Sequence, residues 1–303
     1  MNLLNAIKAL VLTVVLELPL ASFAGEPPLN IKVFNGGEDH FGFAINSVIV
    51  TGKQDAILID AQFTLSNAHR LVAEILETGK RLTTIYITHA HPDHFFALET
   101  LKAAFPKARV VSIPVVAQAI EDAYDFKLNY WGKILGNNAA KTRVKIESLA
   151  EDYIDLEGHQ LKILGPMQGD MADSSVVWIP SIRTLVAGDA VFSGTHVWLF
   201  SAKTLEERQA WLKALDEFEA LEPAVVVSGH TQNNRQLDPS SIQFTRRYIQ
   251  TFEKQLHASK NSDDLIKRMN KLYPKLGLPI CLEFSAKGLK DGWKWDGDFQ
   301  PQK

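Results

Sequence analysis

Residues 82–94 read LTTIYITHAHPDH, an apolar run that ends in three histidines and one aspartate. The run is rich in β-branched residues and predicts a strand that carries the polar cluster at its end. Imidazole nitrogens and carboxylate oxygens are ligands that zinc prefers, and iron and manganese also accept them. Because alternate side chains of a strand point the same way, His89 and His91 can converge on one ion. The turn that follows then directs Asp93 and His94 towards a second ion, so the sequence predicts a metal-binding protein.

Three further candidate ligands lie where predicted strands end. Asp189 follows the apolar run LVAG, His230 follows VVVSG, and Asp170 lies in the turn GPMQGD between two strands. A carboxylate at position 189 could bridge two cations through its two oxygens. Each residue also has a structural interpretation, because turn aspartates often cap backbone amides and lone histidines often serve packing. Taken singly, these three positions leave both interpretations open.

The remaining pattern predicts strands and then helices, twice over. Short apolar or alternating runs predict strands at 31–34, 43–50, 56–59, 82–87, 109–112, 152–156, 159–164, 175–179, 184–187 and 224–227. Apolar spacing of three and four predicts helices at 67–78, 95–104, 115–135, after a capping box at Thr204 and Glu207, and twice within 240–273. The stretch 277–303 receives no assignment.

No linker divides the chain, so we expect one domain over 25–303, with a helical extension from about 240. Its class is α/β (α+β), a four-layer αβ/βα sandwich of two packed mixed sheets with outer helices.

Composition narrows the classes of partner. The 303 residues are 46% hydrophobic and carry a formal net charge of -3, with a pI of about 6.3. No Lys/Arg cluster is present that could follow a phosphate backbone, which argues against nucleic acid as a partner and favours a small-molecule substrate. Cys281 is the only cysteine, which excludes an intrachain disulfide and a cysteine-rich zinc site. The sequence does not indicate an oligomeric state.

The first 24 residues resemble a cleavable export signal. Lys8 supplies a positive charge, an apolar stretch follows at 9–16, and Ser22-Phe23-Ala24 is a small-x-small cleavage site. Glu17 and Pro19 interrupt the apolar stretch, which is too short for a membrane-spanning helix. We therefore expect a periplasmic or secreted protein with no membrane association after cleavage. The alternative is an amphipathic N-terminal helix on a cytoplasmic protein.

Together, these motifs resemble the metallo-β-lactamase-fold metallo-hydrolase superfamily over roughly residues 30–232. The resemblance rests on H-x-H-x-D-H at 89–94, then Gly-Asp at 188–189 and Gly-His at 229–230, in that order. It implies a first ion held by His89 and His91, a second held by Asp93, His94 and His230, and a bridge at Asp189. It also implies that Thr88 and Asp60 support the ligand loop from behind.

One position departs from the family pattern. No histidine occurs between His159 and His196, where the family has its third histidine, and the chain has Asp170 there. We expect Asp170 to be the ligand; the alternatives are Gln168 as ligand or a loosely occupied first site. An extra carboxylate makes the site more anionic, so manganese or iron becomes a candidate beside zinc. A dinuclear zinc site remains the first expectation.

The resemblance implies a metal-dependent hydrolase. A hydroxide activated by the metal would attack an ester, lactone or thioester, with Asp93 as the catalytic residue that orients the nucleophile and takes its proton. A β-lactam substrate is the alternative within this class, and Asp189 argues against it because some β-lactamases have a cysteine there. Outside the hydrolase class, the chain could be a mononuclear iron oxidoreductase or a non-catalytic metal-binding protein.

Aromatic residues of the middle helix and of the segment after Asp189 could wall a substrate pocket. These candidates are Tyr124, Phe126, Tyr130, Trp131, Trp198 and Phe200. His196 lies close to Asp189 in the sequence, and its structural interpretation is favoured over a role in the cleft.

Overall fold

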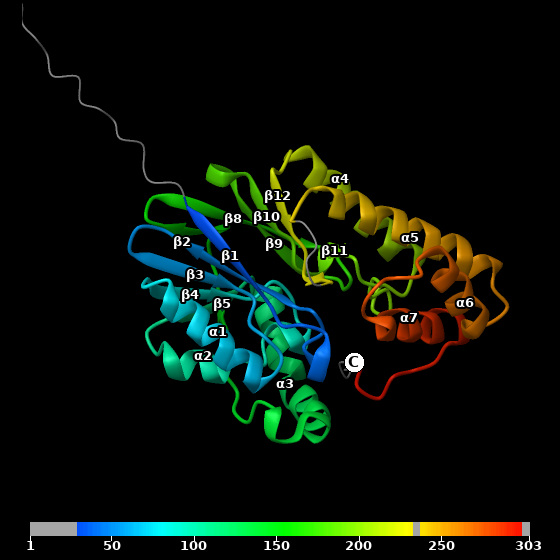
Figure 1. Ribbon diagram of the computed structural model, residues 1–303, viewed down its shortest axis with the longest axis horizontal. Coiled ribbons are helices and arrows are strands. Elements are labelled where there is room, and N and C mark those ends of the chain that lie inside the picture. The colour runs from blue at the N-terminus through cyan, green and yellow to red at the C-terminus, as the bar shows by residue number, and fades with distance from the viewer. Residues whose placement is uncertain (1–28, 233–236, 299–303) are drawn as a thin grey trace, which may run out of the picture.

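The computed structural model describes residues 29–232 and 237–298, so the predicted export signal at 1–24 lies outside the described residues. Two β-sheets pack against each other, and helices cover their outer faces (Figure 1). The predicted four-layer α/β sandwich is therefore confirmed. Within the described ranges, no helix is long and apolar enough to span a membrane.

The first sheet carries the histidine motif. Its six strands lie in chain order: β1 (Asn30–Asn35), β2 (Asn46–Thr51), β3 (Asp55–Ile59), β4 (Arg81–Tyr86), β5 (Arg109–Ser112) and β6 (Glu147–Ser148). The pairs β1–β2 and β2–β3 are antiparallel, and the pairs from β3 to β6 are parallel. The motif follows β4 directly, so it lies at the carboxyl ends of the parallel strands, where α/β proteins commonly bind ligands.

The second sheet carries the remaining candidate ligands. Its strand order is β12 (Val225–Val227), β10 (Thr184–Val186), β9 (Ser174–Ile179), β8 (His159–Met167) and β7 (Tyr153–Leu156). A short parallel pair, β11 (Phe192–Ser193) with β13 (His230–Thr231), lies beside it.

Strand β9 shows why the strand runs are apolar throughout. Val177 and Ile179 belong to the core that also contains the first sheet, whereas Val176 and Trp178 pack with the helices outside the second sheet. Successive side chains of a strand point to opposite faces, so a strand buried on both faces needs apolar residues at every position.

The helices form the two outer layers. Helices α1 (Leu65–Glu77), α2 (Leu98–Ala104) and α3 (Pro114–Leu135) lie outside the first sheet, and α4 (Leu205–Ala220) and α5 (Ser240–Ala258) lie outside the second (Figure 1). Helices α6 (Ser262–Leu272) and α7 (Pro279–Asp291) extend from α5 at one end of the molecule. The predicted capping box of Thr204 and Glu207 is present at the start of α4.

Three sequence-based boundaries are corrected. The strand predicted at 43–50 begins only at Asn46, because Phe43 and Ala44 have φ of 49° and 52°, outside the strand region. The helix predicted at 95–104 begins at Leu98, because the 3-10 turn Pro92–His94 is followed by Phe95, whose φ of -137° lies outside the helical region. The unassigned stretch 277–303 contains α7.

Candidate metal centre

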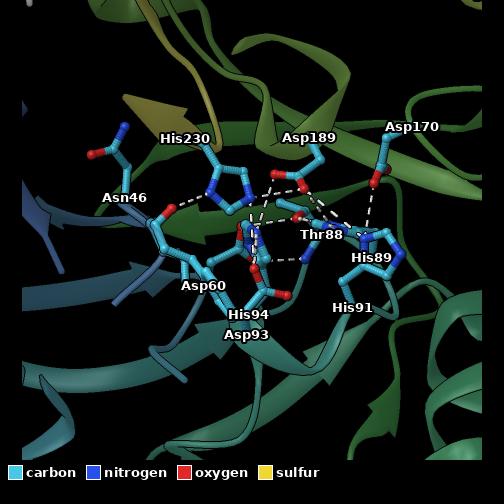
Figure 2. Close-up of polar contacts among 12 residues, drawn as sticks. Asn46, Asp60, Thr88, His89, His91, Asp93, His94, Asp170, Asp189 and His230 are labelled. Carbon is cyan, nitrogen blue, oxygen red and sulfur yellow. Dashed lines mark hydrogen bonds and ion pairs between the residues drawn. The ribbon is translucent and has the colours of Figure 1, made fainter. Parts of the chain in front are cut away.

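All seven predicted metal ligands lie together at one edge of the two sheets (Figure 2). The first sheet contributes the turn after β4. The second sheet contributes the turn between β8 and β9, the 3-10 turn Gly188–Ala190 after β10, and β13 after β12. The predicted ligands form two groups, and within each group one ligand atom per residue lies within 4.8 Å of the others. The first group is His89, His91, Asp170 and Asp189, and the second is Asp93, His94 and His230.

The first group contains the aspartate that departs from the family pattern. His91 Nδ1 lies 2.8 Å from Asp170 Oδ2 and 4.0 Å from Asp189 Oδ2. Asp170 is completely buried. Water therefore cannot stabilise its charge, and a neighbouring group has to do so. Gln168, the alternative ligand, is only partly buried, and its Nε2 donates to Gly169 O at 3.1 Å. The geometry therefore supports Asp170 over Gln168 as the third protein group at the first position.

The Asp189 carboxylate lies between the two groups. Its Oδ1 is 3.1 Å from His94 Nε2, and its Oδ2 is 3.0 Å from His230 Nε2 and 3.6 Å from His89 Nε2. Asp93 Oδ2 is 3.6 Å from His230 Nε2 and 3.9 Å from His94 Nε2. One carboxylate thus faces donor atoms of both groups, which is the arrangement required of a bridging ligand.

Several of the candidate ligand atoms have no hydrogen-bond partner among the described residues, which suits atoms that bind a metal ion. His89 Nε2, His94 Nε2 and Asp189 Oδ1 are buried and make no hydrogen bond. Buried polar atoms in folded proteins are nearly always hydrogen-bonded, and a bound ion is one explanation for an exception. Nitrogen and oxygen donors without cysteine sulfur suit zinc, iron or manganese.

Asp60 and Thr88 hold the histidines from behind, as predicted. Asp60 accepts hydrogen bonds from Thr88 N and Thr88 Oγ1, both at 2.8 Å, and its Oδ2 lies 2.9 Å from His94 Nδ1. Thr88 Oγ1 lies 2.9 Å from His89 Nδ1. Because Thr88 Oγ1 donates to Asp60, it accepts from His89. The Nδ1 atoms of His89 and His94 are therefore the donors to these supports, and each neutral ring would present its Nε2 to a metal ion.

A second support, for His230, carried no signal in the sequence. His230 Nδ1 donates to Phe43 O at 2.6 Å. Asn46 donates to Ser228 O at 2.8 Å, and its backbone N–H donates to Gly229 O at 2.8 Å. A side chain at Gly229 would overlap Asp189 Oδ1, so glycine is required where these two turns approach. Asn46 lies 182 residues before Ser228 in the chain, so no local sequence motif could indicate that it stabilises the turn that carries His230.

Charges within the site perturb its pKa values. Burial lowers the pKa of His91, but Asp170, together with Asp189 and Asp93, outweighs burial, and the pKa of His91 rises to about 10. The pKa values of His94 and His230 are also raised despite burial, chiefly by Asp189. Burial raises the pKa of Asp189, but His230, His94 and His89 outweigh it and hold the pKa well below the ordinary range. Without a cation, the histidines therefore retain protons that a metal would have to displace.

We accordingly expect zinc binding at pH 7 to release about one proton or more per chain, and zinc affinity to rise with pH. A raised histidine pKa means that protons compete more strongly, so the affinity gain should extend above pH 7. Calorimetric titrations of zinc in buffers of different ionisation enthalpy measure the release. An observed enthalpy that does not depend on the buffer would contradict this expectation.

An aromatic cavity of about 80 Å³ opens over the candidate ligands His91, Asp93, Asp189 and His230. Its other lining residues are Phe43, Phe63, Pro92, Lys127, Trp131, Trp198, Leu278, Ile280, Cys281, Phe284 and Trp295. Among the predicted pocket aromatics, Trp131 and Trp198 line this cavity, and Tyr124, Phe126, Tyr130 and Phe200 do not. Tyr124 is instead buried in the core and donates to Thr142 O. Lys127 and the wall from 278–295 were not predicted from the sequence.

His196 does not line the cavity. It is buried, and its Nδ1 lies 2.8 Å from the Tyr248 hydroxyl of α5. Burial lowers its pKa to about 4, so the ring is neutral at physiological pH. The structural interpretation of His196 is confirmed.

Comparison with known proteins agrees with the fold. The family model of the metallo-beta-lactamase superfamily matches residues 40–230, more than half of the chain. A metallo-beta-lactamase family protein from Thermus thermophilus has a TM-score of 0.60 at 16% identity, covering 84% of this chain and 90% of its own. A metallo-beta-lactamase from Pontibacter korlensis has a TM-score of 0.53 at 20% identity, covering 74% and 95%. At these identities, the structural likeness shows the fold alone.

Curated relatives match over shorter stretches. The metallo-beta-lactamase type 2 of Bacillus cereus is 25% identical over 155 residues, which is 50% of this chain and 52% of that protein. The uncharacterized protein YobT of Bacillus subtilis (strain 168) is 36% identical over 70 residues, 23% of this chain and 29% of that protein. The matched part thus spans about half or less of each relative. The family match, the two-sheet fold and the gathered ligands together show that this chain belongs to the metallo-beta-lactamase superfamily.

Proposed function

We propose that this protein is a metal-dependent hydrolase of small ester, lactone or thioester substrates. The observation that carries the proposal is the Asp189 carboxylate, which faces imidazole nitrogens of both ligand groups beside an aromatic cavity. Such an arrangement suits two cations that share one ligand and adjoin a substrate site. The cavity is lined mainly by aromatic and apolar side chains with a few polar groups, which suits a small molecule rather than a macromolecule.

Zinc is the proposed metal, with two ions per chain, and manganese or iron is the alternative. When bound, zinc supplies a hydroxide near neutral pH and polarises the bond under attack. The first ion would be held by His89, His91 and Asp170, the second by Asp93, His94 and His230, and both by Asp189.

The protein's own groups supply orientation and proton transfer. Asp93 lines the cavity and is held near His94 and His230, so it is placed to orient the nucleophile and accept its proton. Thr88 and Asp60 keep the facing histidines in one tautomer. The aromatic walls exclude water from the apolar part of the substrate, which strengthens the polar interactions at the reacting group.

We further propose that the protein acts in the periplasm or outside the cell, on the basis of the signal-like sequence at 1–24. Cell fractionation of the full-length chain, followed by N-terminal sequencing of the exported form, tests this proposal. Retention of an uncleaved chain in the cytoplasm would contradict it.

β-Lactam hydrolysis is a second candidate, favoured by the similarity to the Bacillus cereus protein named a metallo-beta-lactamase. Asp189 argues against it, because some β-lactamases have a cysteine at this position. A substrate panel that contains esters, lactones, thioesters and a chromogenic cephalosporin therefore separates the two candidates.

The deciding experiment combines metal content with turnover. Elemental mass spectrometry of the purified chain should find about two zinc or manganese ions per chain. Activity on the panel should disappear after chelation and return when zinc is restored. One iron per chain and no hydrolysis of any panel member would favour an oxidoreductase or simple metal binding instead.

A further inference from the structure

Helix α3 places two hydrogen-bond donors on one wall of the cavity. Lys127 and Trp131 are four residues apart, so they lie on the same face of the helix, and both line the cavity above the candidate metal ligands. Both side chains are buried, with 6% of Lys127 and 8% of Trp131 exposed. Lysine is almost never buried to this extent unless its charge is paired.

The surroundings of Lys127 satisfy only part of its hydrogen-bonding capacity. Its Nζ donates to Gly297 O at 3.0 Å and lies 5.5 Å from the centre of the Trp295 ring. An ammonium group has three donors, and no ion pair of Lys127 with a carboxylate occurs among the described residues. Burial lowers its pKa, although Asp298 and Asp93 oppose this through their charge.

Trp131 provides the second, independent observation. Its indole Nε1 is buried and has no hydrogen-bond partner within the described part of the chain. Its ring is held by edge contacts with Phe63 and Trp295, whose centroids lie 5.0 Å and 5.8 Å away. The Trp131 ring is fixed by its neighbours and its N–H is unpaired, while the Lys127 ammonium on the same helix face has only part of its hydrogen bonds. Both groups are therefore donors that require an acceptor.

We propose that Lys127 and Trp131 bind a carboxylate of the substrate, and that the substrates are small apolar or aryl compounds with one such group. This inference rests on the proposed function for the reacting end of the substrate. One buried cation balances one negative charge, which favours a carboxylate over a doubly charged phosphate. The neighbouring walls, including Phe43, Trp198 and Phe284, accept the apolar part. The carboxylate contact therefore determines which end of the substrate faces the metal ligands.

The test compares binding of two nearly isosteric probes, phenylacetate and phenylacetamide, by calorimetry on the full-length, zinc-loaded chain. Replacing Lys127→Met should weaken phenylacetate binding about 10- to 100-fold and change phenylacetamide binding by less than about twofold. Trp131→Phe keeps an aromatic ring at this position but removes the indole N–H, and should weaken phenylacetate binding about two- to tenfold. Metal content is measured for each variant, so that a loss of zinc, which could itself weaken phenylacetate binding, is recognised.

Lys203→Met is the matched control. Lys203 lies outside this cavity and contacts Asp298 Oδ2 at 3.1 Å, so its loss disturbs the same C-terminal segment without touching the proposed carboxylate site. Binding of both probes should be unchanged. Equal losses for both probes in Lys127→Met, or no preference for phenylacetate in the wild type, would overturn the proposal. Absence of hydrolytic activity would defeat the proposed function and leave this binding result standing.

Discussion

Asp189→Ala is expected to lower the metal content by about one ion per chain and to reduce hydrolytic activity by about 10²- to 10⁴-fold. The Asp189 carboxylate faces His89, His94 and His230, and removing one partner from a buried charged group costs about 3–5 kcal/mol. Each 1.4 kcal/mol corresponds to a factor of ten. Elemental mass spectrometry and turnover of the best panel substrate measure the two effects.

Asp122→Ala is the control for this prediction. Asp122 is an exposed aspartate of α3 that accepts a hydrogen bond from Gln118 and contacts none of the candidate metal ligands. Its replacement should leave both metal content and turnover unchanged. Unchanged metal stoichiometry in Asp189→Ala would show that the bridging role is wrong.

Asp170→Ala is expected to weaken metal binding at the first position and to destabilise the metal-free chain by about 3–5 kcal/mol. Asp170 is the carboxylate beside His91, and its loss leaves the partly buried, protonated imidazole without its partner. The pKa of His91 should consequently fall from about 10. Chemical denaturation of the chelated protein gives the change in stability, and competition with a chromogenic chelator gives the change in zinc affinity.

Gln168→Ala separates Asp170 from its rival. Both residues lie in the turn between β8 and β9, but the Gln168 amide bonds to the backbone of its neighbour. Its replacement should change zinc affinity by less than about twofold. The reverse result, a large loss in Gln168→Ala and none in Asp170→Ala, would assign the ligand to glutamine.

The local sequence was sufficient for most strands, most helices and the histidine motif. Strand β9 was recognisable as a continuous apolar run because both of its faces are buried, and α5 was recognisable by its period of 3.6 because one face is buried. The motif at 89–94 could be interpreted because its ligands are neighbours in the chain. Short strands such as β11 and β13 were missed, because two residues cannot display a period.

The pocket was only partly predictable. Trp131 and Trp198 were candidates by composition, whereas Trp295 and Phe284 reach the cavity from a C-terminal segment without a clear pattern. Lys127 lies on the buried face of α3, whereas a charged residue in an amphipathic helix is normally assigned to the exposed face.

The sequence by itself determined the fold class and the metal-ligand residue types, because both depend on neighbouring residues and on their order along the chain. Only the tertiary structure decided that Asp170 lies beside His91, that Asp189 lies between two ligand groups, and that Lys127 faces the cavity. The physical reason is that these residues come from separate elements. Their approach depends on how the two sheets, α3 and the C-terminal segment pack, and packing between distant segments leaves no periodic trace in the chain.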